Sequence, residues 1–368
     1  MRMPYPRNCG AAMRKEAIFS PAVLGSKAYA VAEVPADMLK LDAMEAPQDF
    51  PAHLREAWLR TLADVPLNRY PPARDLVLQA QLRHIFGIDD DYGLLLGNGS
   101  DELIQILLMA LRKDAVVLAP APTFVMYRIV CDWLGLRYRS IDVLPDFSLD
   151  MPAMLAAIAQ EQPALIFLAQ PNNPTGKAYP ETDIRRIAEA AQGLVVIDEA
   201  YLAFSEGSMQ ALLAEYDNLL ILRTLSKTGF AGLRFGYLFG AREWTAQLDK
   251  VRPPYNVNVL TQASILFVLQ HYEEIAAQAA LIKQERAAFC TALDGLRHCR
   301  YWSSQANFVV LRTPNADAWF AQLKERGILV KNLHGAHPLL ADCLRLTISQ
   351  AQDNRLLFKA LEELDAQQ

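Results

Sequence analysis

The chain has 368 residues, of which 52% are hydrophobic, 9% aromatic and 21% charged, and its net charge is −5. This composition is typical of a globular protein with two domains or one large one, and so weak an acidic balance argues against non-specific nucleic-acid binding as its main role. No run approaches the roughly 18 apolar residues of a membrane span, and the N-terminus lacks the apolar segment of a secretory signal.

The cysteines and histidines exclude two further classes of protein. Five cysteines are odd in number and scattered, without a CxxC pair, which argues against a disulfide framework or a zinc knuckle. The six histidines form no HExxH motif and have no metal-ligand spacing. These features predict a cytoplasmic enzyme without a bound metal.

The first 40 residues lack a strong period and are expected to form an N-terminal arm. Residues 41–258 then alternate short apolar runs with helical patterns. The runs are rich in Val, Ile and Leu and do not alternate, which is typical of strands covered on both faces. The predicted strands are Tyr92–Leu96, Ala115–Ala119, Ala164–Leu168, Leu194–Ile197 and Leu219–Leu222, and the predicted helices include Asp101–Leu111 and Glu181–Ala191. This order predicts an α/β fold whose mostly parallel central sheet is flanked by helices.

Residues 259–368 have a different pattern, a long helical region followed by a mixture of strands and helices, which predicts a smaller α+β domain. A helical region is expected over Leu260–Leu296, and a second helix over Asp317–Arg326. Strands are expected at Asn307–Leu311, Ile328–Val330 and Cys343–Ile348, followed by a C-terminal helix.

Three polar residues follow three predicted strands of the large domain. Asn173 follows Ala164–Leu168 within Pro171–Gly176, Asp198 ends the run Val195–Ile197, and Lys227 follows Leu219–Leu222. Taken singly, they have ordinary explanations as a turn, a helix cap and a surface charge. In an open α/β sheet, however, ligands bind outside the carboxyl ends of the strands. The three residues are therefore expected to share one site.

A fourth segment, Gly97–Glu102, turns from a strand into a helix. It matches neither the dinucleotide-binding nor the P-loop pattern, so by itself it indicates only a tight turn. Together the segments supply a phosphate cradle, an amide, a carboxylate, a phenol and a lysine, the set that a pyridoxal phosphate site requires. Lysine can form a Schiff base with the cofactor aldehyde, and a buried Asp keeps the pyridine nitrogen protonated. Helix-start N–H groups, a Ser and an Arg can hold the phosphate.

At this point the sequence resembles the fold-type I pyridoxal-phosphate-dependent aminotransferases, and within them the histidinol-phosphate aminotransferase family. The resemblance extends over nearly the whole chain. The matching stretches are Leu39–Pro47, Asn68–Pro71, Gly97–Ile104, Pro122–Tyr127, Pro171–Gly176, Val195–Tyr201, Arg223–Lys227, Ala231–Tyr237, Ala306–Arg312 and Leu344–Ser349. Each stretch is weak evidence alone, but ten in the same order are strong evidence.

The resemblance implies a role for each matching cofactor residue. It makes Lys227, Asp198 and Tyr201 the catalytic residues: Lys227 forms the Schiff base, Asp198 pairs with the pyridine nitrogen, and Tyr201 binds the ring oxygen together with Asn173. Tyr127 is expected to stack on the ring face. The residues expected to bind the phosphate are Gly99, Ser100, Asp101, Ser226, Arg234 and, from the other subunit of a homodimer, Tyr70.

The resemblance also implies the substrate residues. Tyr29, Asn173, Lys331 and Arg345 are expected to bind the substrates, with Arg345 receiving the glutamate carboxylate and the substrate phosphate in alternate half-reactions. Asn307 is expected to orient Arg345 or, equally, to be only a polar residue at the start of a strand.

Three positions depart from the family pattern. Glu45-Ala46-Pro47 stands where the family usually has Glu-Asn-Pro, and Lys331 stands where many members have Arg, so the charge stays but the bidentate fork is lost. Arg234 follows Lys227 by seven residues rather than the commoner eight. The loop must be tighter, and Gly229 is the expected place for the adjustment.

The sequence thus predicts a homodimeric aminotransferase that moves an amino group between glutamate and imidazole-acetol phosphate, with small molecules as its only ligands. Two alternatives share the fold, an aromatic-amino-acid aminotransferase and a threonine-phosphate decarboxylase. A regulatory cofactor-binding domain without catalysis is a further alternative, but it would require a lost lysine or aspartate and a DNA-binding segment, neither of which is present.

Overall fold

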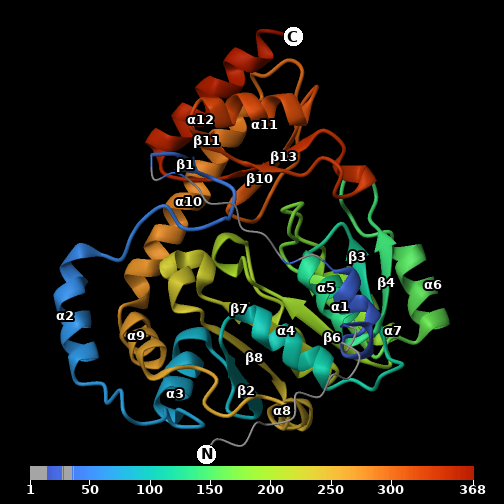
Figure 1. Cartoon of the computed structure of the whole chain (residues 1–368), viewed down its shortest axis with the longest axis vertical. Helices are drawn as coiled ribbons and strands as arrows, with labels where there is room; N and C mark the ends of the chain where they lie inside the picture. The colour runs from blue at the N-terminus through green and yellow to red at the C-terminus, as the bar shows by residue number, and fades with distance from the viewer. Residues whose placement is uncertain (1–14, 27, 29–34, 36) are drawn as a thin grey trace, which may run out of the picture.

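The computed structural model describes residues 15–26, 28, 35 and 37–368. These residues form a large α/β layer structure that carries a smaller α+β part on one end, where the C-terminus lies (Figure 1). Within the described residues, no helix is both long enough and apolar enough to cross a membrane.

The larger part is built on a seven-stranded sheet, in agreement with the predicted fold class. Its strands stand in the order β2-β8-β7-β6-β5-β3-β4. Only β8 runs antiparallel to its neighbours, β2 and β7; the other pairs are parallel. The strands are β2 Tyr92–Gly97, β3 Val116–Ala121, β4 Arg137–Asp142, β5 Leu165–Ala169, β6 Leu194–Asp198, β7 Leu219–Thr224 and β8 Gly236–Ala241.

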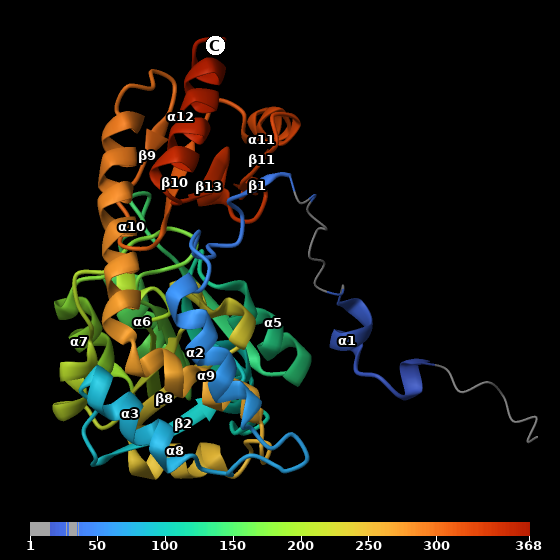
Figure 2. The same ribbon diagram turned by 90° about the vertical axis from the view of Figure 1, so that its left-hand side faces the viewer.

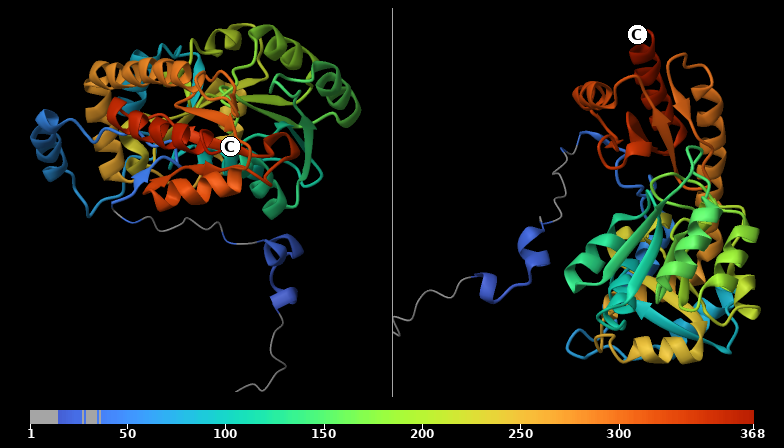
Figure 3. Two further views of the ribbon diagram at one scale, coloured as in Figure 1. Left: turned by 90° about the horizontal axis from the view of Figure 1, so that it is seen from above. Right: turned by 90° about the vertical axis from the view of Figure 1, so that its right-hand side faces the viewer.

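Helices cover both faces of this sheet, which explains why its central strands are continuously apolar. On β7, Leu220 packs into one hydrophobic cluster and its neighbour Ile221 into the other. One cluster contains α4 Ser100–Met109, α5 Val125–Leu134 and α8 Arg242–Asp249. The opposite cluster contains α3 Leu76–Phe86, α6 Met151–Glu161, α7 Glu181–Ala190 and α9 Val259–Gln270. Views from above and from the side show these layers (Figure 3).

The smaller part contains an antiparallel sheet in the order β12-β13-β10-β9. The strands are β9 Arg300–Tyr301, β10 Phe308–Arg312, β12 Lys331–Asn332 and β13 Cys343–Thr347, and the helices around it are α10 Tyr272–Leu293, α11 Ala316–Glu325 and α12 Ala351–Asp365. A separate parallel pair joins β1 Leu39–Lys40 to β11 Ile328–Leu329. The chain therefore enters this part before it builds the large sheet.

The remaining elements lie outside both sheets. Helix α1 Pro21–Gly25 stands beside α5, away from the main body, and α2 Ala52–Ala63 packs against α9 (Figure 2). Helix α10 runs from the large part to the small part in the same view. The short 3-10 helices are Lys15–Ala17, Leu202–Phe204, Gln210–Ala214, Ala231–Leu233 and Pro338–Leu340.

The structure differs from two of the expected elements and contains two strands of the large sheet that were not predicted. The helical region expected over Leu260–Leu296 is two helices, because His271 leaves the helical conformation at φ −116°, ψ 24°. The strand expected over Ile328–Val330 ends one residue earlier, as β11, and the chain then enters β12, which belongs to a different sheet. Strands β4 and β8 were not predicted: β4 is a polar edge strand, and β8 begins with a glycine and has another inside it.

Candidate functional site

A pocket lies at the carboxyl ends of β5, β6 and β7. Asn173, Asp198 and Lys227 all line it, as their positions after three parallel strands predicted. The other lining residues are Met44, Ser100, Asp101, Phe124, Ala169, Pro171, Ala200, Tyr201, Thr224, Ser226 and Arg234.

Asp198 is the last residue of β6 and is almost completely buried. Burial raises its pKa to about 6, and the hydrogen bonds that it accepts from the Tyr127 hydroxyl and the Ala200 amide oppose this rise. The Tyr127 hydroxyl lies 2.6 Å from Oδ2, and the Ala200 nitrogen lies 3.1 Å from Oδ1. Asp198 is therefore a mostly ionised carboxylate at neutral pH, aimed into an enclosed pocket where a cationic partner would stabilise it.

The structure does not support the expected stacking role of Tyr127. Its ring stacks on Phe167 at a centroid distance of 4.2 Å, and its hydroxyl is bonded to Asp198, so it lies behind the pocket wall. Phe124, three residues earlier, lines the pocket instead, with its ring edge-on to Tyr127 at a centroid distance of 5.6 Å. Tyr127 is thus a positioning residue for Asp198, and Phe124 supplies the exposed aromatic face.

Lys227 lies in a tight π-type turn, Ser226–Phe230, that follows β7. The turn contains Gly229 at φ 100°, a left-handed conformation that glycine adopts without strain, at the residue where the shorter loop was expected to adjust. Burial lowers the pKa of Lys227 to about 8, and Arg345 adds to this effect. Its Nζ is 3.4 Å from the carbonyl oxygen of Ala43. A substantial fraction of this amine is therefore neutral near physiological pH and able to act as a nucleophile.

The start of α4 forms one end of the pocket. Gly99 precedes the helix at φ 85°, and Ser100 and Asp101 begin it. A Cβ at Gly99 would come within 2.6 Å of the Arg234 guanidinium, so only glycine allows the cation to lie across the helix start. Arg234 Nη2 is 2.9 Å from Asp101 Oδ2. Free helix N–H groups beside a guanidinium form an anion site.

The end of β7 adds hydroxyl groups to this anion site. Ser226 Oγ and Thr224 Oγ1 are 2.8 Å apart, and Thr224 Oγ1 also donates to the Phe235 carbonyl oxygen at 2.8 Å. Because the Thr224 proton goes to this carbonyl, Ser226 is the donor of the pair, and its hydroxyl would rotate to donate to a bound anion. Thr224 was not among the predicted residues.

Arg345, on β13, is not among the lining residues but contacts one of them, Asn173, from the small sheet. Its Nη1 donates to Asn173 Oδ1 at 2.6 Å, and its Nη2 donates to the Asp42 carbonyl oxygen at 2.7 Å. Asn307, the residue expected to orient Arg345, donates its Nδ2 to the Met44 carbonyl oxygen at 3.0 Å. Asn173, in the turn after β5, is one residue that holds the Arg345 guanidinium in place.

Lys331 is directly opposite Arg345 in the antiparallel pair of β12 and β13. Opposite residues of such a pair project from the same face of the sheet. The two cations thus stand side by side, although Lys331 is exposed and does not line the pocket.

Tyr201 is buried against the pocket, and its hydroxyl is 3.2 Å from the sulfur of Met44. Burial raises the pKa of this phenol, so it is protonated and available as a hydrogen-bond donor. Two other predicted residues remain to be placed. Tyr70 is 80% exposed, stacked on Tyr255 at 4.7 Å and not among the lining residues. Tyr29 lies outside the described residues.

A buried ion pair lies behind the pocket and was not predicted. Arg223 Nε is 2.8 Å from Glu199 Oε2, and both side chains are at most 4% exposed. Arg223 also lies over the Phe239 ring at 5.0 Å. In the sequence, the pair could have been suspected only because Glu199 directly follows Asp198 and Arg223 lies near the end of the strand before Lys227.

Comparisons with known proteins agree with this geometry. Residues 36–361 match the model of the aminotransferase class I and II family. A histidinol-phosphate aminotransferase of Chromobacterium violaceum is 48% identical over 343 residues, which are 93% of this chain and 96% of the relative. The chain belongs to the class I and II aminotransferases, and within them to the histidinol-phosphate aminotransferase family. A second relative in this family, from Nitrosococcus oceani, is 46% identical over 93% of this chain and 96% of its own length.

Solved aminotransferases have the same fold. The histidinol-phosphate aminotransferase of Clostridium acetobutylicum aligns with a TM-score of 0.83 at 21% identity, over 90% of this chain and all of that one. The Sinorhizobium meliloti enzyme, solved in complex with pyridoxal-5'-phosphate, aligns with a TM-score of 0.82 at 21% identity, over 95% of this chain and 98% of that one. At this identity the two structures support the fold alone.

Proposed function

We propose that this aminotransferase moves an amino group between glutamate and imidazole-acetol phosphate, giving histidinol phosphate in histidine biosynthesis, with pyridoxal 5'-phosphate as its cofactor. The observation that carries the proposal is the composition of the pocket. It combines an anion site at the start of α4, the buried carboxylate of Asp198 and the buried amine of Lys227 in the turn after β7. The identity of nearly half the residues to histidinol-phosphate aminotransferases supports the choice of substrate.

The residues fit this cofactor at both of its ends. The amides at the start of α4, the Ser226 hydroxyl and Arg234 would hold the phosphate. Asp198, whose burial calls for a cationic partner, would hold the protonated pyridine nitrogen. When bound, pyridoxal phosphate supplies an aldehyde for the amino group and an electron-withdrawing ring.

Lys227 would hold the cofactor covalently and then act as the base. Because burial lowers the pKa of its amine to about 8, it takes up and releases a proton near neutral pH. Tyr201 and Asn173 would donate hydrogen bonds to the ring oxygen, and Phe124 would cover one ring face.

Arg345 and Lys331 would bind the anionic groups of the two substrates. Arg345 would accept a carboxylate in a bidentate geometry, while Lys331 adds a second positive charge beside it. Two adjacent cations stabilise a phosphate dianion better than they stabilise a carboxylate, which has a single negative charge.

A screen of half-reactions tests the substrate. Purified enzyme loaded with pyridoxal phosphate is mixed with histidinol phosphate, phenylalanine, tyrosine or threonine phosphate, and the loss of cofactor absorbance is followed. We expect the fastest conversion with histidinol phosphate. Faster conversion of phenylalanine or tyrosine would indicate an aromatic aminotransferase, and release of carbon dioxide from threonine phosphate a decarboxylase.

We also propose a homodimer in which Tyr70 contacts the phosphate bound to the partner chain. The loop around Tyr70 and the start of α3 expose large apolar side chains, namely Leu67, Tyr70, Leu76 and Val77, each at least 65% exposed. Such a patch on a small area of a monomer is typical of a protein–protein interface. Tyr70 is also too exposed in its own chain to line its own pocket.

Mixing inactive subunits tests the shared site. Lys227→Ala and Tyr70→Ala variants are combined under conditions that exchange subunits, and exchange is confirmed by mass. Random pairing makes about half the dimers mixed, and each mixed dimer has one intact site if Tyr70 acts in trans. About a quarter of all sites should then regain activity; no recovery would place Tyr70 outside the partner's site.

Finally, we propose a division into an arm of residues 1–40, a cofactor-binding domain 41–258 and a smaller domain 259–368. The two separate sheets support it, although α9, just after the second boundary, packs on α2 and α3 of the larger domain. We propose a cytoplasmic location because the four cysteines within the described residues are free thiols, which suits a reducing compartment.

A further inference from the structure

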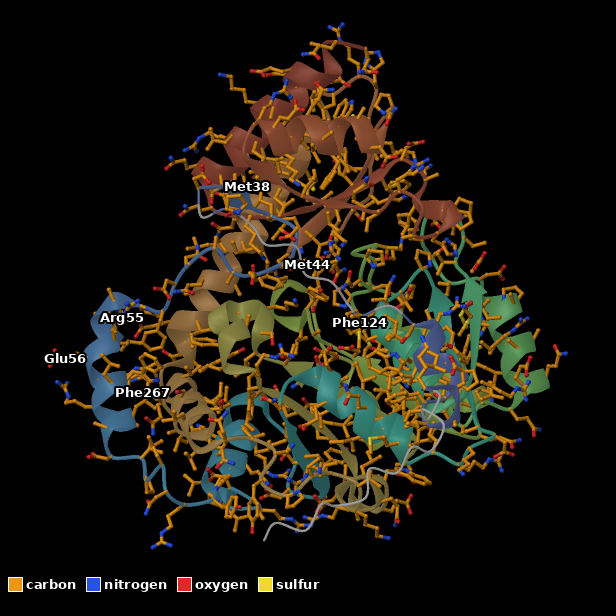
Figure 4. The ribbon with its side chains drawn as sticks, viewed as in Figure 1. Met38, Met44, Arg55, Glu56, Phe124 and Phe267 are labelled. Carbon is orange, nitrogen blue, oxygen red and sulfur yellow. The ribbon has the colours of Figure 1, made fainter. Side chains whose placement is uncertain are left out.

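Three consecutive residues, Asp42, Ala43 and Met44, contact three different groups in or beside the pocket. The Asp42 carbonyl oxygen accepts from Arg345, the Ala43 carbonyl oxygen accepts from Lys227, and the Met44 sulfur accepts from Tyr201. This segment, which we call the 42–44 strap, follows β1 and leads from the β1–β11 pair to the pocket. Met44 is labelled in Figure 4.

Met44 has an unusual backbone conformation. Its φ of 56° is in the left-handed region, where a residue with a side chain is strained. Two hydrogen bonds fix this conformation: the Met44 nitrogen donates to Thr347 Oγ1 at 3.2 Å, and its carbonyl oxygen accepts from Asn307 Nδ2 at 3.0 Å. Both partners belong to the region of the small sheet and lie about 260–300 positions later in the chain.

This conformation directs the Met44 side chain into the pocket. The side chain is 92% buried, lines the pocket and lies against the Tyr201 hydroxyl. Two other large side chains with apolar surface line the pocket within the described part of the chain, Phe124 and Tyr201, and the proposed function assigns both to the cofactor. Met44 is therefore a large apolar side chain of the pocket lining to which the proposed function gives no role.

The geometry points to Met44 as a specificity-determining residue. Its thioether contacts the imidazole ring of histidinol phosphate or imidazole-acetol phosphate and so favours these ring-bearing substrates over glutamate. This inference rests on the proposed function. A thioether is polarizable and makes favourable contacts with aromatic rings, including at the ring edge. Glutamate has no ring and would gain little from it, so Met44 should discriminate between the two substrates of one enzyme.

The test measures substrate binding and half-reaction rates for Met44→Ala, Met44→Leu and wild type. The matched control is Met38→Ala, the same chemical change six residues earlier. Met38 precedes β1 and does not line the pocket; both methionines are labelled in Figure 4. Binding of histidinol phosphate and of glutamate is measured by calorimetry in a Lys227→Ala background, which separates binding from catalysis. Thermal unfolding of each variant is recorded alongside.

We expect Met44→Ala to reduce the affinity for histidinol phosphate, and the rate of its half-reaction, at least 5-fold more than the corresponding values for glutamate. Met44→Leu, which keeps the apolar volume, should lose less than half of that discrimination, and Met38→Ala should show none. Equal losses for both substrates would overturn the inference, because Met44 would then act only through Tyr201. No loss for either substrate would also overturn it.

The two proposals fail in different ways. If wild-type enzyme does not convert histidinol phosphate at all, the proposed substrate is wrong. If wild-type enzyme converts it and the Met44→Ala variant keeps the same ratio between the two substrates, only the role of Met44 is wrong.

Discussion

Asp198→Asn should stabilise the cofactor-free protein while it nearly abolishes amino transfer. The carboxylate is buried at the end of β6, and the loss of its hydration lowers the stability of the folded protein. An amide has almost the same volume and carries no charge, so it removes that cost. It also cannot hold the proton of the pyridine nitrogen, so turnover should fall by several orders of magnitude.

The size of the stabilisation follows from the pKa of Asp198. Burial raises the pKa from 3.8 to about 6, which corresponds to about 3 kcal/mol of folding free energy at neutral pH. An amide in this site has fewer ideal partners than the carboxylate and gives back about 1 kcal/mol. We therefore expect the variant to gain about 1–3 kcal/mol at pH 7.

The pH dependence has a definite sign. The folded pKa of Asp198 is above its unfolded value, so the charge destabilises the wild-type fold fully above about pH 6 and ceases to do so as the pH falls toward 4. The advantage of the Asn variant should therefore shrink over the same range.

Urea unfolding of the cofactor-free proteins at pH 7 and pH 4.5 measures this advantage, with Asp217→Asn, an exposed residue, as the control. A variant less stable than wild type at pH 7, or one with near-normal turnover, would refute the reasoning. Asp198 would then be a structural cap.

Three further predictions concern other parts of the site. Lys227→Ala should abolish turnover and the covalent bond to the cofactor; mass spectrometry after borohydride reduction should find no modified lysine, and a label on another lysine would contradict the assignment. Lys331→Ala should weaken histidinol phosphate about 10-fold more than glutamate in the half-reactions, because it removes a charge that suits a phosphate; equal losses for phenylalanine and histidinol phosphate would favour an aromatic aminotransferase. Arg223→Met should destabilise the fold by about 3–5 kcal/mol in urea unfolding, because Glu199 stays buried without its partner; adding Glu199→Gln should restore much of the loss, and a single variant as stable as wild type would show that the pair is not needed.

Most of the large sheet and the centre of the pocket could be predicted from the sequence. Strands covered by helices on both faces must be apolar throughout, so β3, β5, β6 and β7 were visible as short runs. In a parallel sheet, the residues that follow such strands meet at one edge. This local rule brought Asn173, Asp198 and Lys227 together.

Only the tertiary structure decided which of two aromatic residues faces the pocket. Phe124 and Tyr127 are three positions apart at the start of α5, so a helical period alone does not distinguish them. The Tyr127 ring stacks on Phe167 of β5, and Phe124 lines the pocket.

The 42–44 strap is the clearest case of information that the sequence by itself does not contain. Met44 takes its left-handed conformation from hydrogen bonds to Asn307 and Thr347, which are far away in the chain. A pattern of neighbouring residues determines strands, helices and turns, because their hydrogen bonds and burial are local or periodic. Contacts between segments hundreds of residues apart depend on how the two sheets pack, and that packing is settled only when the whole chain has folded.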